Sequence, residues 1–328
     1  MTILDAYAAT YEELLAVPVV KGTKSVDERF AGAYFTTTTE IYVPVSGRGI
    51  QGATSHQLGQ NFSKMFKIWF LDEQNEKQLV WQTSWGLSTR SIGAMIMVHS
   101  DDMGLVLPPR VAHTQVVIVA IEKVGEDESN KAIIAKCNEV WKDLKAAGIR
   151  VVFDDRDIYK SGWKFNHWEQ RGVPVRIEIG KKDLDKGEVR CAKRHDSVKM
   201  QLKTEDLGTQ VNELLEKIHH EMYEKALQAR LSHVKEVDNW TDFMVALAGR
   251  NICLTPWCDE QQCEIDAKER SKEESIKAME EQNEDEAMLT GAAKTLCIPH
   301  EQPKLAEGAK CFHCGKPAKV TALWGRSY

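Results

Sequence analysis

An unbroken apolar run in the middle of the chain constrains the fold more than any other feature. Residues 116–121 contain no polar side chain, and such a run suits a parallel strand that is covered on both faces. A helical pattern follows from about residue 126 to residue 147, where Gly148 closes it. Residues 149–153 form a second apolar segment. Strand, helix and strand with short links predict a βαβ unit.

Prolines and further apolar patterns divide the rest of the chain. Pro108 and Pro109 break the chain before the βαβ unit. Apolar residues alternate along residues 173–179, which predicts a strand, and residues 189–193 are expected to pair beside it. From Leu207 onward the apolar side chains fall on one helical face. We therefore predict three domains, at residues 1–107, 108–205 and 206–328.

Other local patterns predict individual elements. Residues 35–45 are rich in β-branched side chains and are expected to form a strand. The helix expected after Gly86 has little polar face, which predicts that it is buried. Residues 241–249 are expected to form a helix capped by Thr241. Residues 264–287 are rich in Glu and Lys and are expected to be a solvated helix or a mobile loop.

The bulk composition is that of an ordinary globular protein. The chain has 328 residues, of which 42% are hydrophobic and 28% charged, so it has room for two or three domains. Its net charge of −6 means that any RNA-binding face must be a local basic patch. We expect no membrane span and no signal peptide, because no run of eighteen apolar residues and no basic leader is present. A cytoplasmic protein is expected, with its eight cysteines buried or bound to metal.

Two polar segments near the start of the chain have the residues of a ligand site. Residues 49–59 hold Gln51, Thr54 and His56 between glycines, which gives either a polar lining with room for a ligand or a hydrogen-bonded turn. Arg90 follows a strand end and a tight turn, at the start of an otherwise apolar helix. Its planar guanidinium suits phosphate oxygens. The alternative for Arg90 is an ordinary surface arginine.

These segments resemble the last third of a class II aminoacyl-tRNA synthetase catalytic domain. The similarity is greatest to prolyl-tRNA synthetases of the eukaryotic and archaeal type, and Gly86-Leu87-Ser88-Thr89-Arg90 looks like their motif 3. In that family the arginine of motif 3 holds the terminal phosphate of ATP, so the resemblance implies a catalytic role for Arg90. The ATP-binding residues that it implies are Gln51, Thr54, Ser88, Thr89 and Arg90. The proline-binding residues that it implies are His56, Phe30 and Glu40.

The resemblance implies an ATP-dependent ligase that joins L-proline to tRNA(Pro) through prolyl-adenylate. Catalysis in that family is positioning plus stabilisation of negative charge by arginine and Mg²⁺, within a homodimer. Motifs 1 and 2 of the family should precede residue 3 and are not found. The chain therefore resembles a C-terminal portion and is not expected to activate proline alone. The alternative is a non-catalytic tRNA-binding or regulatory protein.

A segment after the βαβ unit interleaves aromatic and basic side chains. Residues 162–169 can stack single-stranded bases while neutralising phosphates, and residues 110–205 resemble the anticodon-binding domain of class IIa synthetases. Lys164 is favoured as an RNA contact because lysine is rarely fully buried. Trp163 and Trp168 fit the core equally well. The candidate anticodon-binding residues are Lys164, Phe165, Glu169, Arg156 and Arg176.

Four cysteines near the end of the chain have the spacing of a metal site. They form a C-x4-C and a C-x2-C pair: Cys258, Cys263, Cys311 and Cys314. Four thiolates can close a structural Zn²⁺ site, and such a site has no open position for the water that a zinc hydrolase needs. The prolyl-tRNA synthetase family has a comparable four-cysteine site. The alternative is reduced thiols without metal, and Cys297 and His313 are spare candidate ligands.

The fold expected from these patterns and from the resemblance is mixed α/β and α+β. It consists of the C-terminal part of an antiparallel catalytic sheet, an α/β anticodon-binding domain and a small α+β zinc-binding domain.

Overall fold

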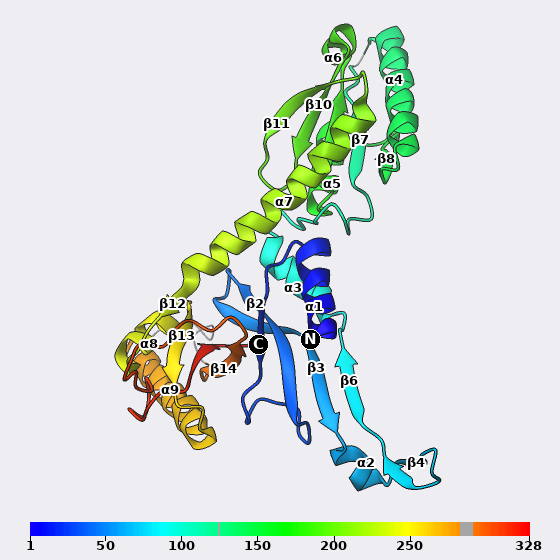
Figure 1. Ribbon diagram of the computed structural model, residues 1–328. Coiled ribbons are helices and arrows are strands. Elements are labelled where there is room, and N and C mark those ends of the chain that lie inside the picture. The colour runs from blue at the N-terminus through cyan, green and yellow to red at the C-terminus, as the bar shows by residue number, and fades with distance from the viewer. Residues whose placement is uncertain (124, 283–290) are drawn as a thin grey trace. The chain divides into compact units, whose positions relative to one another are not determined.

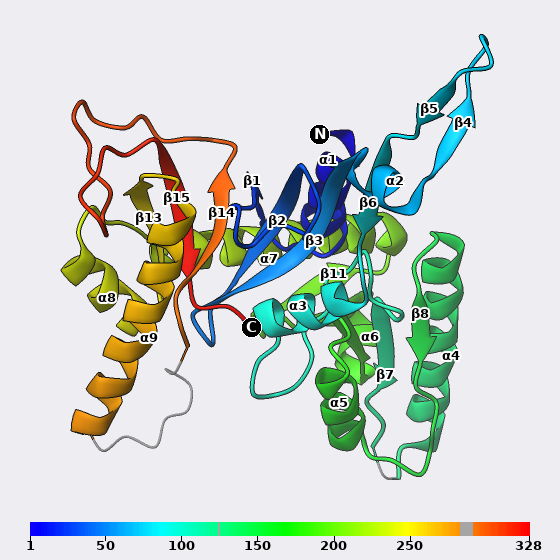
Figure 2. The same cartoon turned by 90° about the horizontal axis from the view of Figure 1, so that it is seen from below.

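The computed structural model describes residues 1–123, 125–282 and 291–328 and contains two compact units (Figures 1 and 2). The first unit comprises residues 1–13, 17–94 and 227–328, so it combines the start and the end of the chain. The second unit comprises residues 14–16 and 95–226. The division into three domains at residues 107 and 205 stays a prediction.

The first unit is built on one eight-stranded sheet, in the order β12-β13-β15-β14-β1-β2-β3-β6. Its strands are β1 (Val20–Thr23), β2 (Phe35–Val43), β3 (Arg48–Gly59), β6 (Gln82–Gly86), β12 (Val234–Glu236), β13 (Ile252–Trp257), β14 (Lys294–Pro299) and β15 (Val320–Gly325). Apart from the parallel pair β12–β13, neighbouring strands in this sheet are antiparallel. The antiparallel sheet expected around residues 35–45 is confirmed.

A close contact between β1 and β14 joins the two ends of the chain within this sheet. Gly22 lies opposite Pro299, and Thr23 lies opposite Ile298. A Cβ atom at position 22 would come within 2.6 Å of the Cys297 sulfur, which is why this position requires glycine. The terminal segment adds to the same connection, because Ser327 forms a parallel bridge with Gly49.

Four helices and a hairpin among the described residues complete the first unit. They are α1 (Thr2–Ala9) with a π-helical turn at Thr10–Leu14, α2 (Asn61–Phe66), α8 (Trp240–Ala248), α9 (Gln261–Gln282), β4 (Trp69–Leu71) and β5 (Lys77–Leu79). Asn239 caps α8 by accepting from the Asp242 backbone N–H at 3.0 Å, so the predicted cap at Thr241 is wrong. Asn239 precedes the helix and can turn its amide oxygen onto the first free N–H groups.

Two other helix predictions need correction. The helix α3 (Arg90–His99) buries Met95 but leaves Ile92 53% exposed, so it is only partly buried. Of the two alternatives expected for residues 264–287, the helix is confirmed as far as Gln282, residues 283–287 lie outside those described, and the expectation that the helix is solvated is wrong for one face. Ser271 and Ser275 give this helix a buried face of small side chains. Small residues allow close packing, and a count of charged residues does not show this.

The second unit is an α/β fold with a five-stranded sheet in the order β11-β10-β9-β7-β8. Its elements are β7 (Val116–Ala120), α4 (Asp127–Ala146), β8 (Val151–Phe153), α5 (Ser161–Gln170), β9 (Val175–Ile179), α6 (Lys181–Lys186), β10 (Glu188–Lys193) and β11 (Lys199–Lys203). The long helix α7 (Leu207–His233) has most of its residues in this unit.

The predicted βαβ unit is confirmed. Strand β7 pairs in parallel with β8 and with β9, and all five residues of β7 are buried. Strand β10 pairs antiparallel with β9, as expected from the pattern of residues 189–193. Among the described residues, no helix combines the length and the apolar character that a bilayer crossing needs.

Candidate functional site

The β2–β3 pair presents a connected row of polar side chains in the first unit. Thr36 lies opposite His56 in the register, and its Oγ1 is hydrogen-bonded to His56 Nδ1 at 2.9 Å. The other ring nitrogen of His56 is hydrogen-bonded to Thr54 Oγ1 at 3.2 Å. The Phe30 ring stands 4.8 Å from the imidazole, centroid to centroid. Partial burial lowers the pKa of His56, which favours the neutral ring. The structure therefore brings together Phe30 and His56, two of the three predicted proline-binding residues.

Glu40, the third of these residues, takes part in a buried ion pair. Its side chain is 2% exposed, and its Oε1 lies 2.7 Å from Lys24 Nζ. Thr38 donates a second hydrogen bond to the same oxygen at 2.6 Å. Lys24 also donates to the backbone carbonyl of Leu296, in β14, at 2.7 Å. Burial raises the pKa of Glu40, and the Lys24 ammonium opposes that rise. The observed contacts of this carboxylate are thus with structural partners in the sheet.

Strand pairing brings Thr54, one of the predicted ATP-binding residues, beside the segment that holds Ser88, Thr89 and Arg90. Thr54 lies opposite Gly86 in the β3–β6 register, so β3 and residues 86–90 are neighbours. A Cβ atom at Gly86 would meet no atom within 4 Å, which leaves the backbone there open to a ligand. Arg90 is exposed, and its backbone N–H donates to Ser88 Oγ at 3.3 Å. Burial raises the pKa of Tyr11 to about 12, and the nearby Arg90 charge opposes this rise.

Gln51 and Thr89 complete this predicted set. Gln51 lies in β3, three residues before Thr54, and its side chain is partly exposed. Thr89 is exposed in the turn between β6 and α3. From the sequence, residues 49–59 could be either a polar lining or a hydrogen-bonded turn. In the structure they belong to β3, a strand twelve residues long. Its hydroxyl, amide and imidazole groups can hydrogen-bond a polar ligand.

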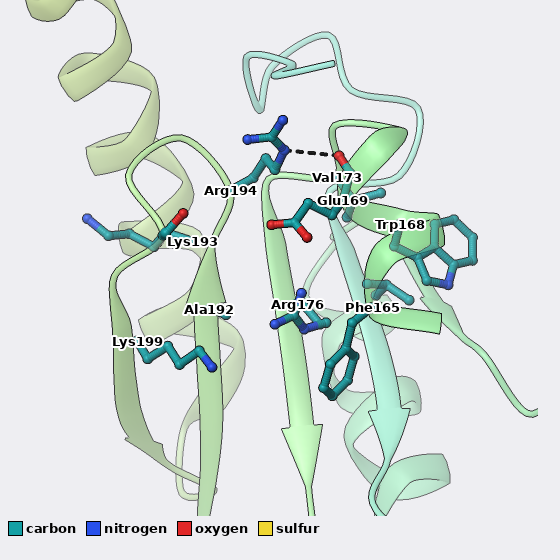
Figure 3. Close-up of a pocket in the computed structure, with 11 residues that line it drawn as sticks. Phe165, Trp168, Glu169, Val173, Arg176, Ala192, Lys193, Arg194 and Lys199 are labelled. Atoms are coloured by element: carbon teal, nitrogen blue, oxygen red, sulfur yellow. Dashed lines mark hydrogen bonds between the residues drawn. The ribbon is translucent and has the colours of Figure 1, made fainter. Parts of the chain in front are cut away.

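A pocket of about 280 Å³ lies in the second unit, between α5 and strands β9 to β11 (Figure 3). Three predicted RNA-binding residues, Phe165, Glu169 and Arg176, line it. The Arg176 guanidinium lies 4.1 Å from the centre of the Phe165 ring, and its Nη2 donates to Glu178 Oε1 at 2.9 Å. A ring, a fixed guanidinium and a carboxylate can together stack on a base and hydrogen-bond its edge.

Three basic residues of the pocket were missed from the sequence. Lys193 ends β10, Lys199 begins β11, and Arg194 follows Lys193 in the connecting turn. All three lie in the basic run of residues 190–199. Had this run been read as a β-hairpin, the alternation of its side chains could have placed them on one wall of a pocket. Lys193 is buried and paired with Asp196 and Glu221, and Arg194 is buried and paired with Asp101, whereas Lys199 is exposed and offers its positive charge to a ligand.

Lys164 does not line the pocket, and the argument that favoured it is wrong. Its side chain is buried, with the residue only 4% exposed, and its Nζ donates to the backbone carbonyl of Asp154 at 2.9 Å. A lysine can be buried when a carbonyl accepts from its ammonium in this way. Lys164 lies on the side of α5 that faces the sheet. The usual exposure of lysine side chains cannot reveal this.

Arg156 and Trp163 form a separate cluster on this unit. Asp154 holds Arg156 through two hydrogen bonds of 2.8 and 2.6 Å. Although burial acts in the opposite direction, hydrogen bonds from Arg156 and Trp168 lower the pKa of Asp154 to about 2. The Trp163 ring is 42% exposed and stacks on Tyr159 at 3.7 Å, centroid to centroid. Trp163 is therefore a surface residue, whereas Trp168 is half-buried and lines the pocket.

The four predicted cysteine ligands meet at one point in the first unit, with all four sulfurs within 4.8 Å of one another. The Cys258 and Cys314 sulfurs are 3.6 Å apart, and those of Cys263 and Cys311 are 3.7 Å apart. Four thiolates at the usual Zn–S length of about 2.3 Å would be about 3.8 Å apart in a tetrahedron. The geometry and the donor type therefore fit a structural Zn²⁺ ion.

The two spare candidate ligands behave differently. His313 Nδ1 lies 3.5 Å from the Cys263 sulfur, next to the cluster. Cys297 is fully buried in β14 against Gly22, and burial raises its pKa well above the usual range. Cys137 and Cys191 are likewise buried in the core of the second unit, as packing residues.

Comparisons with known proteins agree with this arrangement. A family model described as "Prolyl-tRNA synthetase, C-terminal" matches residues 240–328, and one described as "Anticodon binding domain" matches residues 115–214. The chain is 50% identical over its whole length to the cytoplasmic proline–tRNA ligase of Arabidopsis thaliana, of which it covers 59%. It is 46% identical to a putative proline–tRNA ligase of Saccharomyces cerevisiae, covering 48% of that protein. It is 41% identical to proline–tRNA ligase 2 of Clostridioides difficile, covering 62%.

The chain thus spans about half the length of the curated relatives it matches. Its residues correspond to the C-terminal part of those proteins.

Proposed function

Because the chain is homologous along its whole length to the C-terminal portion of prolyl-tRNA synthetases, we propose that it serves the ATP-dependent ligation of L-proline to tRNA(Pro). The pocket lined by Phe165, Glu169 and Arg176 carries this proposal, because it lies within the matched anticodon-binding domain. In this role the second unit reads the anticodon, and the β2–β3–β6 part of the first unit contributes to the site of proline activation.

At the activation site, Arg90 is proposed to bind the terminal phosphate of ATP. Arg90 is exposed at the start of α3. A phosphate can therefore reach its guanidinium without breaking any contact described for it. Gln51, Thr54, Ser88 and Thr89 are proposed to hydrogen-bond the nucleotide. Mg²⁺, when bound with ATP, would neutralise charge that develops on the phosphates.

On the proline side, Phe30 and His56 are proposed to border the substrate. The Phe30 ring offers an apolar contact for the pyrrolidine ring. Hydrogen bonds from both sides fix the His56 imidazole, so it presents one orientation to a ligand. Glu40 is proposed to support this site indirectly. Its carboxylate is paired with Lys24 and accepts a hydrogen bond from Thr38, which holds Thr38 in place.

In the second unit, a base is proposed to stack near Phe165 while Glu169 and Arg176 hydrogen-bond its edge. Lys199, which is exposed at the start of β11, is proposed to neutralise a neighbouring phosphate. Arg156 and Lys164, which lie outside the pocket, are proposed to support it by fixing Asp154 and α5. The four cysteines are proposed to hold a structural Zn²⁺ ion. A cytoplasmic location is proposed from the name of the Arabidopsis thaliana relative. A homodimer is proposed from the family resemblance.

Two measurements on purified residues 1–328 test the proposal. The first is the affinity for a fluorescent hairpin carrying the proline anticodon, compared with the same hairpin carrying a scrambled loop. The second is proline-dependent exchange of pyrophosphate into ATP. We expect specific hairpin binding without exchange, because the motif 2 arginine of the family is not in this sequence.

Each outcome has a distinct meaning. Equal affinity for both hairpins would overturn the proposed anticodon pocket. Exchange by the isolated chain would overturn the expectation that it needs motif 2. The third outcome is that the chain binds the hairpin, but exchange stays absent after the N-terminal portion of a proline–tRNA ligase, containing motifs 1 and 2, is added. This outcome would favour the non-catalytic tRNA-binding function instead.

A further inference from the structure

Arg194 lines the pocket and also makes buried contacts behind it, which we call the joint. Recognition of a base does not require these contacts. Its side chain is 3% exposed, and its guanidinium pairs with the Asp101 carboxylate through hydrogen bonds of 2.8 and 2.6 Å. Its Nε donates to the backbone carbonyl of Glu169 at 2.9 Å, as the dashed line in Figure 3 shows. One side chain thus binds both the end of α5 and the segment that follows α3.

Backbone contacts make this joint continuous. The Leu105 N–H donates to the Gln170 carbonyl at 3.0 Å, and the Leu107 N–H donates to the Gly172 carbonyl at 3.3 Å. A Cβ atom at Gly104, whose φ is +127°, would come within 2.7 Å of the Gln170 backbone. The segment of residues 101–107 is therefore packed directly against the end of the helix that carries Phe165 and Glu169.

The charges explain why Arg194 is the central element of this joint. Asp101 accepts from two nitrogens of one planar fork, and this pairing lowers the pKa of Asp101. A lysine would supply a single point charge and could not also reach the carbonyls of Glu169 and Gly104 in the same plane. Every described contact of the joint lies within the second unit.

We infer that Arg194 couples occupation of the pocket by RNA to the order of residues 101–107, making it a positioning residue for the segment that follows α3. RNA that binds Phe165 and Glu169 fixes the end of α5. Arg194, which donates to the Glu169 carbonyl, then holds Asp101 at the start of residues 101–107 more firmly. Helix α3 begins at Arg90, the proposed ATP ligand, so the coupled segment is continuous in sequence with it. This inference rests on the proposed function of the pocket.

Hydrogen exchange of the whole chain, followed by mass spectrometry, tests the coupling. In the wild-type protein, saturation with the proline-anticodon hairpin is expected to slow exchange of residues 101–107 by about threefold or more. Asp101→Asn keeps the shape but removes the charge, and Asp101 does not line the pocket. This variant is expected to bind the hairpin within about twofold of wild type and to lose the added protection. Asp102→Asn, an exposed neighbour, is the matched control and is expected to match the wild type.

The outcomes separate the coupling from the function on which it depends. If the wild type binds no hairpin, the proposed function is overturned, and the inference is overturned with it. If the hairpin binds but exchange at residues 101–107 is unchanged, the inference alone is overturned. Protection that persists in folded Asp101→Asn protein would also overturn it, since the joint would then not act through Arg194. Should that variant fail to fold, the wild-type comparison still decides between the first two outcomes.

Discussion

The buried pair between Lys24 and Glu40 gives a stability prediction that can be worked out from distances. Replacing Lys24 with Met keeps most of the apolar stem but removes the ammonium that lies 2.7 Å from the carboxylate. The two side chains are only 7% and 2% exposed, so water cannot replace the lost charge without opening the structure. The variant also removes the hydrogen bond to the Leu296 carbonyl.

The size of the effect follows from this geometry. At 2.7 Å and an effective dielectric constant of about 20, the attraction is about 6 kcal/mol. Part of this is offset because the ammonium no longer has to be desolvated, and breaking one partner of a buried pair costs about 3–5 kcal/mol. With a urea dependence of about 2–3 kcal/mol per molar, the unfolding midpoint should fall by about 1–2 M.

Urea unfolding followed by tryptophan fluorescence measures this shift. Lys21→Met is the matched control, since Lys21 pairs with Asp5 at the surface and its loss should cost less than about 1 kcal/mol. The loss in Lys24→Met should be largest near neutral pH. Removing Lys24 further raises the folded-state pKa of Glu40 above its ordinary value of 4.5, and a raised carboxyl pKa destabilises only above the unfolded value. A loss equal to that of the control, or one that grows as the pH falls, would refute the reasoning.

Three further predictions concern the other sites. Elemental analysis should find one zinc per chain, and chelation should lower the thermal midpoint of wild type but not of Cys263→Ser protein, because metal binding contributes to folding; a midpoint that does not respond to chelation would count against the site. Phe165→Ala should weaken hairpin binding roughly tenfold, by about 1–3 kcal/mol for a lost stacking contact, whereas Trp163→Ala should have little effect; the reverse order in a binding titration would contradict the pocket assignment. The pKa of Asp154 is lowered to about 2 from 3.8, so its contribution to stability is present above pH 3.8 and lost as the pH falls toward 2. Unfolding curves of Asp154→Asn should lack this acid dependence, and acid profiles identical to those of wild type would exclude this contribution of Asp154.

Local patterns in the sequence predicted the second unit well. The run at residues 116–121, the helix after it and the alternation at residues 173–179 each depend on neighbours in sequence, so periodicity reveals them. The pairing of β1 with β14 could not be found in this way. It joins positions more than 270 residues apart, and nothing in either segment specifies the other.

The candidate site shows the same division. Phe165, Glu169 and Arg176 could be proposed because aromatic and charged side chains interleave in and after residues 162–169, and all three line one pocket. Lys164 was misjudged because amino-acid type does not show which side of α5 faces the sheet. Arg194 was missed because its importance depends on Asp101, which is distant in sequence and becomes its partner only in the fold.

The sheet that joins both ends of the chain has a consequence for synthesis on the ribosome. Residues 95–226 are contiguous and can fold as soon as they emerge. Residues 17–94 are made earlier, and within them β1 pairs with β2 on one side, yet its other neighbour in the sheet is β14, at residues 294–299. During translation, this edge of β1 must therefore wait unpaired while about 270 more residues are added. Exposed strand edges invite association with other chains. The long delay therefore exposes this edge of the nascent protein to association until β14 has been made.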